Sequence, residues 1–127
     1  MSTVITLFLC ITFVSVMHSL TEEEKYAIHQ ECSEETAVSE ETVMNAMAGD
    51  FSDDPKLKQY LFCFGKKMGV VNDAGEIQRN VVKTKLMAIV SDEAKIEEMI
   101  DKCAIPKDTP QETAYEASIC MHAIRNA

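Results

Sequence analysis

The fold is organised around one stretch of the sequence, Lys58-Gln59-Tyr60-Leu61-Phe62-Cys63-Phe64-Gly65-Lys66-Lys67-Met68-Gly69. The apolar residues Leu61, Phe64 and Met68 recur at helical spacing, so the stretch predicts an amphipathic helix with one inward face. A cysteine, Cys63, lies in the middle of that helix. Three more cysteines stand at long spacings around it, Cys32, Cys103 and Cys120. The functional interpretation depends on what this cysteine framework holds together.

The composition argues against several classes of function. The chain of 127 residues has a net charge of −9 and a pI near 4.7, and it contains no long basic run. Such a chain is a poor match for nucleic acid or for an anionic membrane surface. Methionine occurs eight times. Because methionine adapts to irregular shapes, these residues either fill an ordinary core or line a space with variable contents. The length predicts a single domain.

Residues 1–19 predict a secretory signal peptide, with cleavage after Ser19, and residues 20–127 predict the mature domain. Val4 to Val16 is almost wholly apolar, and the run is too short to span a bilayer comfortably. Cys10 leaves with this segment. The mature chain then has an even set of four cysteines in an oxidising compartment, which is typical of a disulfide framework. We therefore expect a secreted, soluble protein with no stable membrane insertion.

Capping residues and apolar periodicity predict six helices and no sheet. Thr21 and Glu24 form a capping box, and Asp54-Pro55 places a cap before a proline at the first helical position. The last helix is apolar around most of its circumference, so it is expected in the middle of the fold. The fourth helix is expected over 77–90. The predicted starts of the six helices are Thr21, Ser39, Asp54, Ile77, Ser91 or Asp92, and Thr109.

No motif predicts catalysis or a metal centre. His29 and Cys32 lie one helical turn apart, but no other residue completes a ligand set, so a structural role is favoured. The turn 72–76 lacks the alternating ligands of a calcium loop. His122 is interpreted as a partly buried structural group, with a pH-sensitive role as the alternative. No nucleophile has a recognisable base nearby. We expect no enzyme, no metal and no cofactor.

The order of these features resembles the insect odorant- and pheromone-binding proteins over the whole mature chain. It runs from Cys32 to Tyr60-Leu61-Phe62-Cys63, then through Lys-x-Met-Gly and an Asp-Ala-Gly turn to Cys103 and Cys120. The resemblance implies an all-α, compact bundle of about six helices around an internal hydrophobic cavity. It also implies an extracellular protein of sensillum lymph or haemolymph.

The family pattern has six cysteines, and glutamines occupy two of those positions here. Its second cysteine falls on Gln59 and its fifth on Gln111, which are bonded to each other in six-cysteine members. A chain that lacks both of these cysteines resembles the minus-C branch of the family, which includes beetle carriers. The resemblance implies the pairs Cys32–Cys63 and Cys103–Cys120, whereas the sequence alone allows three connectivities. Without the middle bridge, packing alone is expected to tie the third helix to the sixth, around a softer cavity.

The leading interpretation is a carrier that buries odorants, pheromones or fatty-acid-like molecules, with affinity from desolvation. Tyr115 is expected to offer its hydroxyl to a ligand oxygen. The resemblance implies an odorant receptor downstream, and we expect a monomer or weak dimer. The expected ligand-lining residues are Val43, Met47, Leu61, Phe64, Met68, Val82, Leu86, Ile89, Met99, Tyr115 and Ile119.

Two alternatives come from other classes. A saposin-like protein that acts on membranes or lipids is also small, helical and disulfide-bonded, although the negative charge counts against it. A disulfide-stapled signalling protein needs a receptor and no cavity. The segment after the last cysteine, Met121–Ala127, is expected to be too short to enter a pocket and expel a ligand.

Overall fold

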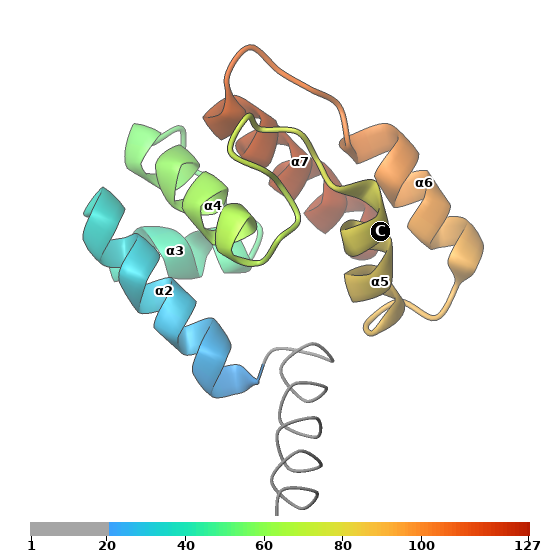
Figure 1. Cartoon of the computed structure of the whole chain (residues 1–127), viewed down its shortest axis with the longest axis horizontal. Helices are drawn as coiled ribbons and strands as arrows, with labels where there is room; N and C mark the ends of the chain where they lie inside the picture. The colour runs from blue at the N-terminus through green and yellow to red at the C-terminus, as the bar shows by residue number, and fades with distance from the viewer. Residues whose placement is uncertain (1–20) are drawn as a thin grey trace, which may run out of the picture.

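The computed structural model of the protein describes residues 21–127, which form six α-helices (Figure 1). This part of the chain contains no β-strand, only a single antiparallel bridge between Val71 and Ile77. The all-α prediction is therefore confirmed, whereas the predicted signal peptide lies outside the described residues. The helices are α2 (Glu22–Thr36), α3 (Glu40–Met47), α4 (Pro55–Lys67), α5 (Arg79–Met87), α6 (Glu93–Cys103) and α7 (Pro110–Arg125).

Five of the six helices begin at a side chain that caps them. Thr21 accepts a hydrogen bond from the Glu24 backbone N–H at 3.1 Å, within a complete capping box. Asp92 accepts from Ala94 N–H at 3.0 Å, and Thr109 accepts from Glu112 N–H at 3.1 Å. Such caps satisfy N–H groups that have no partner within the helix. The helix α5 is the exception, because no side chain caps it.

The predicted bounds of the fourth helix were wrong at both ends. The helix α5 begins at Arg79 and ends at Met87 rather than running over 77–90. A turn precedes it in which the Asn72 side-chain oxygen accepts from two backbone N–H groups, those of Ala74 and Glu76. This turn pairs Ile77 with the strand-like backbone of Val71, so the apolar Ile77 belongs to a hairpin-like bend and not to a helix.

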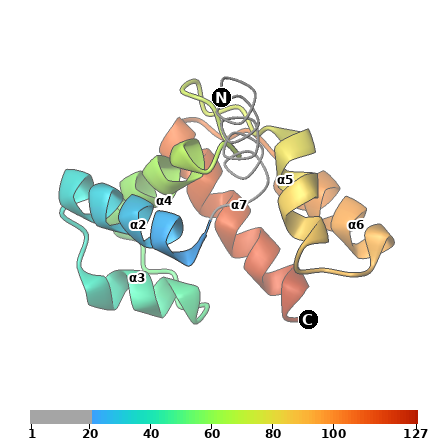
Figure 2. The ribbon, with the colours of Figure 1, turned by 60° about the horizontal axis from the view of Figure 1, so that its bottom comes forward.

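The helix α7 lies in the middle of the molecule, as its apolar circumference predicts (Figures 1 and 2). It packs on α4 at one side and on α6 at the other, while α2 packs on α4 and α5 packs on α6. The described chain therefore divides into an amino-terminal half, α2 to α4, and a carboxy-terminal half, α5 and α6. Each half rests on α7 (Figure 2).

Each half has its own buried cluster. The amino-terminal cluster contains both buried tyrosines and a fully buried leucine, Leu57. The carboxy-terminal cluster is wholly aliphatic and methionine, and its most enclosed members are Ile96 and Met99. The amino-terminal cluster is Cys32, Val38, Val43, Ala46, Leu57, Tyr60, Cys63 and Tyr115, and the carboxy-terminal cluster is Val82, Leu86, Ile96, Met99 and Ile100.

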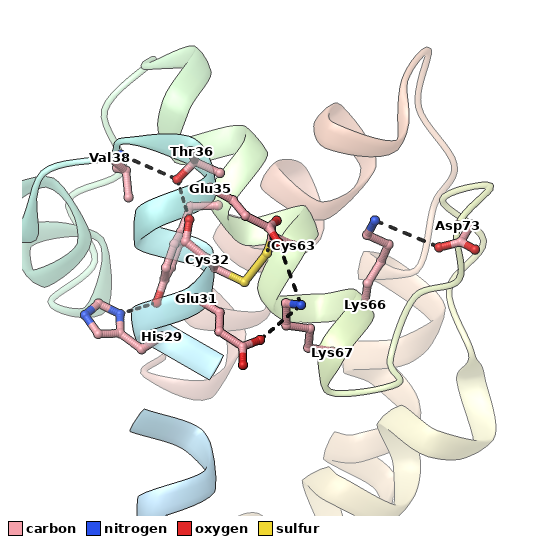
Figure 3. Close-up of a disulfide and its surroundings, with 11 residues drawn as sticks. His29, Glu31, Cys32, Glu35, Thr36, Val38, Cys63, Lys66, Lys67 and Asp73 are labelled. Atoms are coloured by element: carbon pink, nitrogen blue, oxygen red, sulfur yellow. Dashed lines mark hydrogen bonds and ion pairs between the residues drawn. A yellow bond between two sulfur atoms is a disulfide. The ribbon is translucent and has the colours of Figure 1, made fainter. Parts of the chain in front are cut away.

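Each half contains one end of a disulfide or both: the first disulfide lies within the amino-terminal half, and the second joins the carboxy-terminal half to α7. Cys32 pairs with Cys63 and joins α2 to α4, and Cys103 pairs with Cys120 and joins α6 to α7. This is the pairing that the family resemblance implied. Lys67 lies beside the first disulfide, with its Nζ 3.2 Å from a carboxylate oxygen of Glu31 (Figure 3).

The expectation that packing alone ties α4 to α7 was wrong. Lys58 on α4 places its Nζ 2.5 Å from an oxygen of Glu112 on α7 and 2.8 Å from one of Asp53. Hydrogen bonds to the two carboxylates raise the pKa of the Lys58 ammonium. The ion pair stands one residue from both Gln59 and Gln111. An ion pair therefore joins the two helices next to the two glutamines that occupy the family's cysteine positions.

Candidate ligand-binding site

Two apolar hollows lie between the two halves, against α7. The first, which we call the α3 hollow, has a volume of about 280 Å³ and is reached from the side of α3. The second, the α5 hollow, has a volume of about 260 Å³ and lies between α4 and α5. They share four lining residues, Leu61, Leu86, Ser118 and Met121. The two hollows are therefore adjacent and share part of their walls.

Five helices, α3 to α7, and the bend over 70–77 supply the walls. The helix α4 directs Leu61 and Phe64 into the site, and α5 directs Val82 and Leu86 from the opposite side. These pairs lie three or four residues apart, the spacing that keeps two side chains on one helix face. Met99 closes the α3 hollow from α6 and is only 1% exposed.

The α3 hollow opens to solvent at its rim. Met47 on α3 is 77% exposed and Ile89, just after α5, is 58% exposed, yet both line the hollow. Large apolar side chains left in water mark a surface that gains free energy by being covered. A ligand in the hollow would cover part of both side chains, so this rim is the natural entrance.

Eight of the eleven predicted lining residues border these hollows, and three do not. The eight are Val43, Met47, Leu61, Phe64, Val82, Leu86, Ile89 and Met99. Met68 lies at the carboxy-terminal cap of α4 and Ile119 packs against the amino-terminal cluster. Tyr115 is buried in the same cluster.

The structure gives the Tyr115 hydroxyl another partner than a ligand. It donates to the backbone carbonyl oxygens of Phe51 and Ser52, at 3.3 and 3.1 Å. Burial raises the pKa of Tyr115, and the side chain is 7% exposed. A donor engaged in this way is not free for a ligand oxygen. In this structure the Tyr115 hydroxyl fastens the loop before α4 to α7, and its contact with a ligand stays a prediction.

Sequence reasoning expected α7 to contribute Tyr115 and Ile119, whereas other residues of this helix border the α5 hollow. Its residues Ala114, Ala117, Ser118 and Met121 border the α5 hollow, at the spacing of one helix face. Because α7 is apolar on nearly all sides, its pattern did not show which face the site uses. The segment after Cys120, which was expected to be too short to enter a pocket and expel a ligand, supplies His122 and Arg125 to the lining of the α3 hollow.

Another hollow suits a small apolar ligand less well. It has a volume of about 360 Å³ and lies between the 74–77 segment and the 104–110 loop. Its lining includes the charged side chains of Glu76, Arg79, Lys107 and Asp108. Burying an apolar molecule there would desolvate these groups without pairing them.

Within residues 21–127, no three or more His, Cys, Asp or Glu side chains are placed to hold a metal ion. Across the same residues, no helix has the length and apolar character needed to cross a membrane.

A disulfide-bonded bundle of helices with two apolar hollows beside its central helix is suited to bind small hydrophobic molecules. The model of the PBP/GOBP family matches residues 17–124 of the chain. The chain belongs to this family of insect odorant-binding proteins, and it is a carrier of small hydrophobic ligands. Family membership favours this function over the saposin-like alternative.

Known proteins resemble the chain over most of its length. The B1 protein of Tenebrio molitor is 37% identical over 108 residues, which cover 83% of this chain and 83% of that protein. The solved THP12 carrier protein from the yellow meal worm has a TM-score of 0.62 at 36% identity, covering 72% of this chain and 85% of its own. The solved fatty acid binding protein OBP56a from the oral disk of the blowfly Phormia regina has a TM-score of 0.65 at 29% identity, covering 85% and 96%. By their names, the two solved proteins are a carrier and a binding protein.

Proposed function

We propose that the ligand lies in the α3 and α5 hollows, along α7 and between the two halves. The observation that carries this proposal is the adjacency of the two apolar hollows, which share Leu61, Leu86 and Met121 in their walls, combined with the solvent-exposed rim at Met47 and Ile89. Transfer of an apolar chain from water to these walls supplies the affinity, at about 25 cal/mol per Å² of apolar surface buried. The eight lining residues that border the hollows are the proposed contacts.

The proposed ligands are odorants, pheromones or fatty-acid-like molecules of a size that fits the two hollows. We propose that residues 1–19 are a signal peptide, that residues 20–127 are the secreted domain, and that the protein performs no catalysis. The two disulfides between described cysteines support an oxidising destination. We further propose that the protein is a monomer or weak dimer and that it delivers its ligand toward an odorant receptor.

Filling the α5 hollow tests where the ligand lies. Ala117 lines that hollow, so Ala117→Phe places a ring in the proposed site. We expect decanol to bind the parent protein and to bind this variant at least about tenfold more weakly, because the ring occupies the volume that the alkyl chain needs. Displacement of a fluorescent naphthylamine probe by decanol measures both affinities.

The matched control is Ala123→Phe, which adds the same ring to the same helix. Ala123 is exposed and borders neither hollow. This variant should bind decanol like the parent protein. Equal loss of binding in both variants, or no loss in Ala117→Phe, would contradict the proposed location. Absence of decanol binding by the parent protein would contradict the proposed function itself.

A further inference from the structure

The charged groups at the hollows have one sign, although the protein has the other. The sequence contains 21 Asp and Glu against 12 Lys and Arg, yet no acidic side chain lines either hollow. The basic side chains at the two hollows are Lys85 at the α5 hollow and His122 and Arg125 at the α3 hollow. Basic side chains at a site in a negatively charged protein indicate that the site accepts a negatively charged group.

Arg125 and His122 stand together on the last turn of α7. They are three residues apart, so their side chains share one face of the helix. Arg125 is exposed and has no ion-pair partner among residues 21–127. The His122 ring packs edge-on against Phe51, at 5.8 Å between centroids. Neither of its ring nitrogens makes a hydrogen bond to a described residue, so both basic side chains keep free donors at the hollow.

The end of α7 does not cancel this positive charge. The carboxy-terminal end of a helix carries partial negative charge on its last carbonyl oxygens. Here the Asn126 side chain donates to His122 O at 2.8 Å, and the Lys95 ammonium donates to Arg125 O at 3.4 Å. Lys95 therefore adds another cation from α6 beside the same turn. These contacts satisfy part of the helix end and leave the guanidinium available.

We propose that this protein prefers ligands with a carboxylate head, which Arg125 binds at the rim of the α3 hollow with His122 as a second donor. The inference rests on the proposed function, because the alkyl chain of such a ligand occupies the hollows described above. The guanidinium fork matches a carboxylate in geometry and charge. At an exposed rim the head group keeps part of its hydration, so the desolvation penalty of a buried ion pair is reduced. Arg125 is thus a specificity-determining residue.

The test compares decanoic acid with decanol, which have the same chain length and differ in the head group. Isothermal titration calorimetry at neutral pH, where the acid is ionised, gives both affinities for the parent protein and for Arg125→Gln. We expect the acid-to-alcohol affinity ratio to fall about fivefold in Arg125→Gln, with the alcohol affinity unchanged. The ratio removes any general effect of the substitution on the hollow.

Two further variants assign the effect to Arg125. Lys56→Gln removes one positive charge from an exposed side chain on α4 that has no ion-pair partner among residues 21–127. Lys56 borders neither hollow, so this variant should leave the ratio unchanged. Lys85→Gln removes the basic group of the α5 hollow, so it tests the other position that a carboxylate head could take. A ratio that falls with Lys85→Gln and not with Arg125→Gln would overturn the proposal. Equal ratios in the parent protein and Arg125→Gln would overturn it too, while decanol binding keeps the proposed function intact.

Salt dependence supplies a measurement that needs no variant. Added salt screens an exposed ion pair and strengthens apolar burial. The acid-to-alcohol affinity ratio of the parent protein should therefore decrease between low and high ionic strength. A ratio that stays constant would contradict an ion pair between the ligand and Arg125.

Discussion

The amino-terminal and carboxy-terminal halves lie on the same helix, α7, but they are held by different interactions. In the amino-terminal half, a disulfide, a buried cluster with two tyrosines and several polar contacts join α2, α3 and α4. His29 lies 2.7 Å from the Tyr60 hydroxyl and 2.6 Å from a Glu40 oxygen, so one side chain on α2 links α4 to α3. In the carboxy-terminal half, α5 packs chiefly on α6.

The helix α5 is also the least supported element at its ends. It has no side-chain cap, and Met87 at its end is 62% exposed. Its polar links to α6 are ion pairs at the surface, from Lys83 to Glu97 at 3.0 Å and from Arg79 to Asp101 at 2.6 Å. Surface ion pairs of this kind contribute about 0–1 kcal/mol. The site therefore has one fixed wall, which is α4 packed on α7, and one yielding wall, α5, whose contacts cost less free energy to break.

Removal of either disulfide is expected to destabilise the protein strongly, and slightly more in the amino-terminal half. Cys32 and Cys63 are 31 residues apart, and Cys103 and Cys120 are 17 apart. The chain-entropy estimate gives losses of about 3.7 and about 3.1 kcal/mol for the paired substitutions Cys32→Ala/Cys63→Ala and Cys103→Ala/Cys120→Ala. Urea unfolding measures both free energies. A larger loss for the second pair would contradict a more firmly held amino-terminal half.

Core truncation compares the fixed and the yielding wall directly. Leu57 is fully buried in the amino-terminal cluster, and Leu86 is 8% exposed and already borders both hollows. Leu57→Ala should lower the free energy of unfolding by about 4 kcal/mol, and Leu86→Ala by about 2 kcal/mol, because fewer packing contacts surround Leu86. Urea unfolding measures these losses. Only Leu86→Ala should change decanol affinity, and equal losses of stability would argue against two kinds of wall.

The smallest effect concerns Tyr60, one of the two buried tyrosines of the amino-terminal cluster, at high pH. Burial, with a further contribution from Glu40, raises the pKa of Tyr60 to about 12. The ordinary pKa of tyrosine is about 10. The stability from this neutral hydroxyl is fully present below pH of about 10 and is lost as pH rises toward the folded-state pKa, since the unfolded state releases its proton first.

Tyr60→Phe removes this titration from the protein. The free energy of unfolding should therefore fall less steeply with pH in Tyr60→Phe than in the parent protein, by on the order of 1 kcal/mol over the alkaline range. Denaturant unfolding at a series of pH values measures the two slopes. Parallel slopes would show that Tyr60 is not held neutral by the fold.

Local signals explain which parts of the fold were predictable. Thr21, Asp92 and Thr109 cap helices in the structure as their sequence context predicts, because a cap depends on residues within one turn. Ile77 was misassigned because its partner Val71 is reached through a turn set by the Asn72 side chain. An apolar residue before a helix is not distinguished from a helical one by periodicity alone.

The site was predictable in its walls but not in its rim. Leu61, Phe64, Val82 and Leu86 follow from apolar faces, which any buried site between helices must use. The rim depends on how the two halves meet on α7, and this is a property of tertiary packing. Met47 and Ile89 were predicted as lining residues without a signal for their exposure, while Arg125 was not among the predicted residues.

Amide hydrogen exchange of the full chain, with and without decanol, tests the central claim that the ligand lies between a fixed and a yielding wall. In the free protein, the amides of α5 (Arg79–Met87) should exchange faster than those of α4 (Pro55–Lys67), because local opening requires less free energy where few contacts must break. Decanol should slow exchange most strongly in α5 and leave α2 almost unchanged. Equal protection of α4 and α5 in the free protein, or protection by decanol that falls mainly on α2, would contradict the account.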